Sequence, residues 1–192
     1  MKNYYHIYNR GAHKDLIFRD IWDYERMLHL LYIANNSVPI LMRNFGGKDI
    51  FAQERVSPLV TIVAYCLMPN HIHIVLIADV GHLRTEFIRR LATAYSAYYN
   101  AKYEHSGTIW QGKYKSKVVH DENYLRVLLD YVHLNPYSIV ETEMTKEARK
   151  ENRATALVFS GGYEYSSYKE YLGQKRPQSV IIEMLQMSDI CT

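Results

Sequence analysis

The chain has 192 residues, of which 48% are hydrophobic, and this is enough for one domain with a full core and appended segments. It contains no run of about 18 apolar residues and no apolar signal-peptide core, so we expect no membrane span. A net charge of +3 does not by itself indicate nucleic acid, and two cysteines are too few for a disulfide framework, which fits a cytoplasmic protein.

The first half of the chain begins with alternating, β-prone residues 4–9, which predict a strand. A polar and basic loop over residues 10–14 follows. Asp20 has the position of an N-cap for a helix over about 21–35. Residues 38–58 have no clear period and contain two adjacent glycines, so we interpret them as an insertion before the central strands.

The central and later elements follow from apolar periodicity and turn residues. They are strands over 59–67 and 71–78 joined at Met68-Pro69-Asn70, a helix over about 83–103, a basic segment at 113–119, and a helix that Asp121 caps and that Asn135-Pro136 ends. We also expect an aromatic docking segment at 163–168 and a weakly amphipathic tail helix at 179–187.

The order β-α-β-β-α-β-α is typical of an α+β protein with a ferredoxin-like split βαβ fold, in which helices pack on one face of an antiparallel sheet. We expect a main domain over residues 1–140, with the insertion at about 38–58. A C-terminal extension over residues 141–192 completes the chain.

His71 and His73 lie in the second central strand. Because side chains alternate along a strand, the two imidazoles share a face and are spaced about 6.6–6.8 Å apart. Such a pair can bind one metal ion, although the same pattern by itself also occurs on ordinary strand surfaces.

The basic segment places a tyrosine among lysines. If it is a strand, Lys113, Lys115 and Lys117 lie on one side and Tyr114 on the other. The ammonium groups would favour the phenolate and attract phosphate. The alternative is a solvated basic strand with a tyrosine that only packs.

Several motifs together resemble one known family. They are Tyr5-His6-Ile7-Tyr8-Asn9-Arg10-Gly11, the run from Ala64 to His73, the run from Gly107 to Ser116, Tyr131-Val132-His133-Leu134-Asn135-Pro136 and Ser166-Ser167-Tyr168. The sequence resembles the single-tyrosine HUH transposases, an IS200-like family, and within them the REP-associated tyrosine transposases, from about residue 4 to residue 173.

This resemblance implies a function on single-stranded, hairpin-forming DNA. It implies that His71 and His73 bind Mg²⁺ or Mn²⁺ and that Tyr114 attacks a DNA phosphate, which forms a 5′-phosphotyrosine link and frees a 3′-hydroxyl. The residues expected to contact DNA are Arg10, His13, Lys14, Lys113, Lys115 and Lys117.

The third metal ligand departs from the family pattern. Insertion-sequence relatives carry Gln or Asn four residues after the tyrosine, on a helix, whereas position 118 is a valine. The remaining candidates are water, Asn70, Asp121, Glu122 and His120, of which we select His120.

Three functions are compatible with these residues. The first is a strand transferase with a tyrosine nucleophile, used in DNA transposition or recombination. The second is a domesticated hairpin-DNA-binding protein that no longer cuts, which the valine at position 118 favours. The third is a metal-dependent phosphodiesterase that uses water. The sequence leaves open whether the protein is a monomer or a homodimer.

Overall fold

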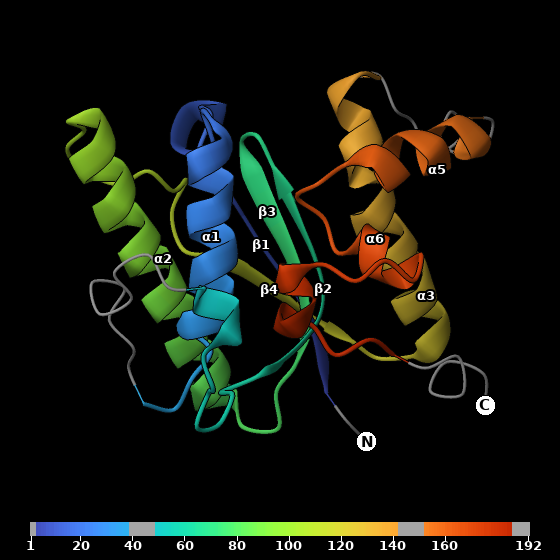
Figure 1. Cartoon of the computed structure of the whole chain (residues 1–192), viewed down its shortest axis with the longest axis horizontal. Coiled ribbons are helices and arrows are strands. Elements are labelled where there is room, and N and C mark those ends of the chain that lie inside the picture. The colour runs from blue at the N-terminus through green and yellow to red at the C-terminus, as the bar shows by residue number, and fades with distance from the viewer. Residues whose placement is uncertain (1–2, 39–48, 142–151, 186–192) are drawn as a thin grey trace.

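The protein is described here by a computed structural model that covers residues 3–38, 49–141 and 152–185. Its main elements are β1 (Tyr4–Arg10), α1 (Ile21–Ile33), β2 (Thr61–Met68), β3 (His71–Ile77), α2 (Gly81–Tyr103), β4 (Lys115–Val119), α3 (Glu122–Leu134), α5 (Arg153–Gly162) and α6 (Tyr168–Tyr171). Short 3-10 turns occupy Ala12–Lys14, Ile50–Ala52, Asn135–Ile139 and Pro177–Ile181. The strands form one antiparallel sheet in the order β2-β3-β1-β4, which confirms the predicted ferredoxin-like class (Figure 1).

Helices cover both faces of this sheet (Figure 1). Ile7 and Ile74 belong to the core shared with α1 and α2, whereas Cys66 and Val75 pack with residues of α3. The expectation that the helices lie on one face was therefore wrong. The physical reason is visible in β2, where every residue after Thr61 is buried, because a strand covered on both sides is apolar on both sides.

The N-caps of two helices are confirmed. The Asp20 carboxylate accepts a hydrogen bond from the backbone of Asp23 at the start of α1, and Asp121 accepts one from Tyr124 at the start of α3. Asp23 also pairs with Lys102 of α2 at 2.7 Å. This contact joins the two helices on one face of the sheet.

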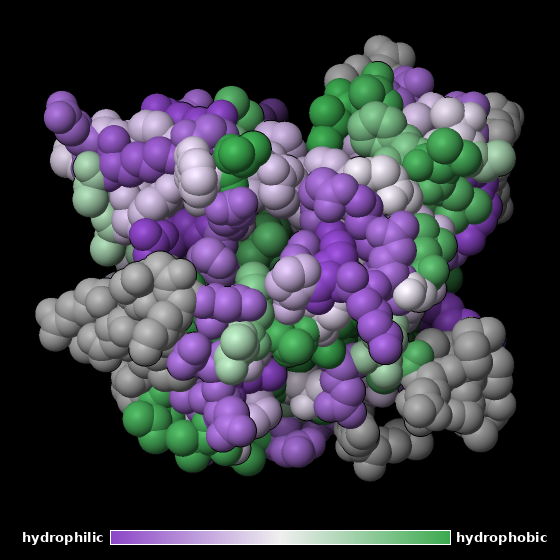
Figure 2. Space-filling model, in the orientation of Figure 1, coloured by the Kyte–Doolittle hydropathy of each residue, from purple (hydrophilic) through white to green (hydrophobic). Residues whose placement is uncertain are grey.

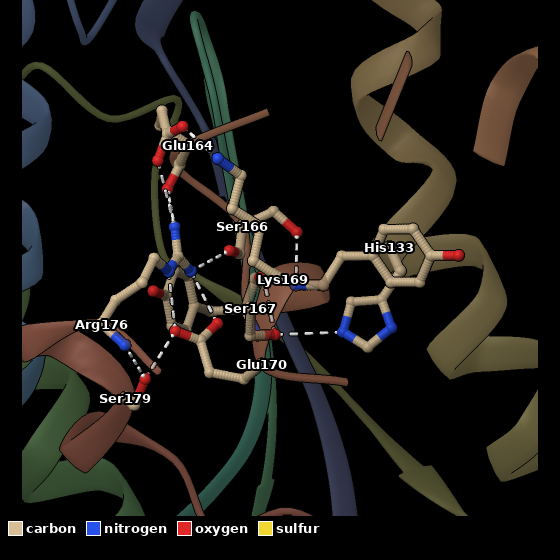
Figure 3. Close-up of polar contacts among 10 residues, drawn as sticks. His133, Glu164, Ser166, Ser167, Lys169, Glu170, Arg176 and Ser179 are labelled. Carbon is tan, nitrogen blue, oxygen red and sulfur yellow. Dashed lines mark hydrogen bonds and ion pairs between the residues drawn. The ribbon is translucent and has the colours of Figure 1, made fainter. Parts of the chain in front are cut away.

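The C-terminal extension lies along the outer edge of β2. Leu67 donates a backbone hydrogen bond to Tyr165, and Ser167 donates one to Tyr65. These bonds hold the aromatic segment at 163–168 against β2, and polar contacts of this region are drawn in Figure 3. The edge of β2 is thus covered by another part of the same chain.

The predicted tail helix at 179–187 is wrong over the residues that the structure describes. Pro177–Ile181 forms only a 3-10 turn, and 182–185 continue without helix, while 186 and 187 lie outside the described residues. Residues 39–48 of the expected insertion and 142–151 of the extension also lie outside them. The division of the chain at residue 140 stays a prediction.

Among the helices that the structure describes, none is both long and apolar enough to cross a membrane. On the face drawn in Figure 2, apolar side chains reach the surface in separate patches among hydrophilic ones.

Candidate active site

A cavity of about 820 Å³ lies between the sheet and α3, at the end of the sheet where β3 begins. Its lining residues are His6, Tyr8, Asn9, Arg10, His71, His73, Gln111, Lys113, Lys115, Lys117, Tyr124, Val127, Leu128 and Tyr131. Four of these residues are lysine or arginine, and no Asp or Glu occurs in this set. Such a positively charged cleft favours a phosphate-bearing ligand.

His71 and His73 both line this cavity, as their shared face predicts. Their rings are perpendicular, with centroids 5.0 Å apart. Burial, and to a lesser degree the charge of Arg10, lowers the pKa of His71 to about 4, although the amide oxygen of Asn135, as an acceptor, favours the protonated ring. His71 is therefore a neutral imidazole near pH 7, the form that binds metals.

Both ring nitrogens of His71 face amide oxygens. Nδ1 is 2.6 Å from Oδ1 of Asn70, and Nε2 is 3.2 Å from Oδ1 of Asn135. A neutral imidazole has only one N–H. The shorter contact, from Nδ1 to Asn70, is the better place for this proton. The other ring nitrogen then presents a lone pair beside the oxygen of Asn135, and a nitrogen and an oxygen donor placed together in this way fit a divalent cation.

The loop after β1 is fastened to the turn that precedes His71. Gly11 donates a backbone hydrogen bond to Asn70, and Ile17 donates one to Pro69. A Cβ atom at Gly11 would lie 2.3 Å from the carbonyl oxygen of Asp15, so this close approach requires glycine. The loop carries His13 and Lys14, whose side chains are exposed and are not among the residues that line the cavity.

One side of α3 forms the opposite wall of the cavity. Tyr124, Val127, Leu128 and Tyr131 line it at helical spacing. The ring of Tyr131 meets the ring of His73 edge-on at a centroid distance of 5.3 Å. Tyr131 thus lies against the histidine pair, and Asn135, four residues later, contacts His71.

Tyr114 is not brought together with the histidines. Lys113 and Lys115 line the cavity, so alternation turns the intervening tyrosine to the other face of the sheet. There it packs against the core under α2, and its hydroxyl is 3.5 Å from that of Thr85. Within the basic segment, Lys115–Val119 is strand β4, and Lys113 and Tyr114 precede it. The contacts of Tyr114 are those of a packing side chain.

His120 is also remote from the pair. It follows Val119, which pairs with Tyr4 of β1, whereas His73 pairs with Tyr8. Four strand residues correspond to about 13 Å, and His120 is exposed at that far end. In the described part of the chain, no three His, Cys, Asp or Glu side chains are arranged to hold a metal ion, so the selection of His120 as third ligand is not supported.

Comparison with known proteins assigns the chain to a family. The sequence model of the family described as "Transposase IS200 like" matches residues 24–135, which is more than half of the chain. The chain belongs to this transposase family. The predicted resemblance is confirmed at this level.

One relative in sequence and one solved structure with a similar fold carry the REP-associated description. A protein of Haemophilus influenzae, named as a predicted REP-associated tyrosine transposase, is 29% identical over 96 residues, which are 44% of this chain and only about half (54%) of the relative. A solved structure described as a REP-associated tyrosine transposase bound to a REP hairpin has the same fold, with a TM-score of 0.52 and 13% identity over 99% of this chain and 89% of that one.

The sequence contains a second candidate pair of a tyrosine and a polar metal ligand. Tyr131 of α3 and Asn135, the C-cap of that helix, have the spacing of four residues that the family resemblance describes for the tyrosine and a polar ligand. We interpreted Asn135 only as the end of a helix. A second residue that sequence reasoning missed is His6, whose Nε2 lies 2.9 Å from Nδ1 of His73.

Proposed function

We propose that this IS200-like transposase cleaves and rejoins single strands of hairpin-forming DNA, with Tyr131 as nucleophile. The observation that carries the proposal is the meeting of α3 with the start of β3, where Tyr131 and Asn135 lie against His73 and His71. This replaces Tyr114 by a tyrosine that faces the same cavity as the histidines.

The choice of Tyr131 rests on its position relative to the histidines and to Asn135. Tyr8 of β1 also lines the cavity, with its ring centroid 6.1 Å from that of His73, but Tyr131 is nearer at 5.3 Å and is followed four residues later by Asn135, which contacts His71. Tyr131 is in ring contact with His73 and also approaches His6 at 6.2 Å. Tyr124 lines the same cavity but lies seven residues earlier on α3, about 10.5 Å along the helix axis. Tyr114 faces the other side of the sheet.

The residues at the cavity fit a divalent metal such as Mg²⁺ or Mn²⁺. His71, His73 and the amide oxygen of Asn135 would hold it, and two imidazole nitrogens with an oxygen donor suit Mn²⁺ or Mg²⁺ better than a thiolate-preferring metal. When bound, such an ion draws charge from the scissile phosphate.

The chain's own groups perform the transfer. The Oη atom of Tyr131 forms a bond to phosphorus while the bond from phosphorus to the 3′ oxygen breaks. The phenol loses one proton to solvent and the leaving 3′ oxygen gains one. Lys115 and Lys117 on β4, which line the cavity, would offset the charge of neighbouring phosphates.

The covalent link keeps the energy of the phosphodiester bond. A second 3′-hydroxyl that enters the cavity can attack the tyrosyl phosphate, which releases Tyr131 and joins two strands without ATP. The positive lining of the cavity, together with the REP hairpin bound by the related transposase of the same fold, supports hairpin DNA as the substrate. Arg10, together with His13 and Lys14 of the loop beside His71, would contact its backbone.

A covalent-adduct assay tests this proposal. Labelled hairpin DNA incubated with the protein and Mn²⁺ should give a band of protein linked to DNA on a denaturing gel. The adduct should be lost in Tyr131→Phe and with EDTA, and retained in Tyr114→Phe and Tyr124→Phe. An adduct that persists in Tyr131→Phe but vanishes in Tyr114→Phe would restore the original assignment.

The same assay separates the two other functions. Tight hairpin binding without an adduct in Mg²⁺ or Mn²⁺ would favour a domesticated binding protein. That alternative depended on the valine at position 118, and Asn135 removes this motive because it supplies a polar group four residues after Tyr131. Cleavage that survives Tyr131→Phe and is lost in His71→Ala would indicate a phosphodiesterase that uses water.

A further inference from the structure

His6 lies in the middle of β1, behind the candidate metal site. Only 6% of it is exposed, and it lines the same cavity face as His73. Its Nε2 atom is 2.9 Å from Nδ1 of His73, and the two rings stack at 5.1 Å with an angle of 24°. A buried pair of imidazoles in hydrogen-bond contact constrains both rings.

One proton connects the two nitrogens of this contact, so one imidazole donates and the other accepts. If Nδ1 of His73 donates, its Nε2 carries the lone pair. If Nε2 of His6 donates instead, His73 accepts through Nδ1 and a neutral ring then has its proton on Nε2. Only the first arrangement leaves Nε2 of His73 able to bind a metal.

Metal-binding histidines usually donate their second N–H to a carboxylate, a carbonyl or water, which sets the tautomer and the ring orientation. For Nδ1 of His73, the group in this position is another imidazole. Lys117, which pairs with His6 from the neighbouring strand β4, lines the same cavity.

We propose that His6 is a positioning residue that accepts the Nδ1 proton of His73 and so presents Nε2 of His73 to the metal. This inference rests on the proposed metal site and adds to it a residue outside the ligand set. His6 makes no contact with DNA or metal in this role. It acts through His73.

Two variants separate the hydrogen bond from the packing of the ring. His6→Phe keeps a ring of similar volume but has no acceptor, whereas His6→Gln can place an oxygen near the former Nε2 position. His29→Phe is a matched control, because His29 is a half-buried histidine of α1 whose ring contacts Phe51. For each variant, the thermal unfolding curve is first compared with that of the wild type, so that only folded variants are assayed.

The first measurement is the affinity of the protein for Mn²⁺ in the absence of DNA, determined by electron paramagnetic resonance. His6→Phe should weaken binding about 10–100-fold, the usual effect of losing the partner of a metal-bound histidine, while His6→Gln recovers much of it. His29→Phe should bind as the wild type does. Wild-type affinity in His6→Phe would overturn the positioning role while leaving the metal site intact.

The second measurement uses the metal-free wild-type protein and needs no variant to fold. Nitrogen-15 NMR of the imidazoles should show His73 protonated at Nδ1 and His6 protonated at its own Nδ1. A proton on Nε2 of His73 would overturn the inference. No binding of Mn²⁺ by the wild type would overturn the metal site itself, and the positioning role with it.

Discussion

Arg176 offers the sharpest test of how the C-terminal extension is held. Its guanidinium donates to both carboxylate oxygens of Glu170, at 2.8 and 2.6 Å, and to the backbone carbonyls of Glu164 and Ser166, both at 2.7 Å (Figure 3). The side chain of Arg176 is 11% exposed and that of Glu170 is 2% exposed. One cation therefore joins three points of the extension.

Replacing Arg176 with alanine leaves the buried Glu170 carboxylate without its counter-ion. Removing one partner of a buried ion pair costs about 3–5 kcal/mol of unfolding free energy. We expect the lower end, about 3 kcal/mol, because Arg176 has partial access to water and Ser179 still donates to Glu170. For a protein of this size, that loss lowers Tm by about 6–12 °C.

Thermal and urea unfolding followed by circular dichroism measure this effect. Arg89→Ala is the control, because Arg89 forms an exposed pair with Glu86, and it should leave Tm close to the wild-type value. Arg176→Met combined with Glu170→Leu removes both charges and should be more stable than Arg176→Ala alone. The reasoning is refuted if Arg176→Ala unfolds within about 1 kcal/mol of the wild type and the double variant brings no recovery.

Three further predictions address the cap, the pH dependence and the charge of the cavity. Asp20→Ala should cost about 1 kcal/mol in urea unfolding through loss of the α1 cap, and an unchanged midpoint would contradict this. Burial raises the pKa of Tyr171 to about 12, so the stability that its protonated form provides is complete below about pH 10 and is lost as the pH rises towards 12. Burial also raises the pKa of other tyrosines, such as Tyr24 and Tyr65, so Tyr171→Phe should make the decline in urea midpoints between pH 9 and 11 shallower without abolishing it, and an equally steep decline would exclude a contribution of Tyr171. Lys115→Gln with Lys117→Gln should lower the salt slope of single-strand binding by about 1.4, the expected value for two lost phosphate contacts, and an unchanged slope would remove both from the DNA interface.

The sequence was sufficient for the features that depend on local physical chemistry. Asp20 and Asp121 were recognised as N-caps because a cap needs only its own side chain and the next turn. The pairing of His71 and His73 on one face followed from strand alternation alone. The tail beyond Pro177 could not be predicted in this way, because its path depends on a backbone hydrogen bond from Glu183 to Ile62 of β2, as well as on the bonds from Arg176 and Ser179 to Glu170.

The candidate nucleophile could not be chosen from local pattern for a related reason. The expected alternation along the basic segment already separated Tyr114 from its flanking lysines, but only the pairing of β4 with β1 decides which side of the segment faces the histidines. That register turns Lys115 and Lys117 towards His73. Tyr114 consequently points into the opposite core.

The position of Tyr131 depends in turn on how α3 is fixed from its other side. His133 lies two residues further along the helix, about 200° around its axis, and so points away from the cavity. Its Nε2 contacts the hydroxyl of Ser167 at 3.0 Å, and that hydroxyl also accepts a hydrogen bond from the backbone of Tyr65 in β2. The docked extension thus connects α3 to the edge of the sheet, and this connection holds Tyr131 against the histidine of the neighbouring strand. An extension that appears peripheral in the chain order is therefore part of the support of the candidate active site.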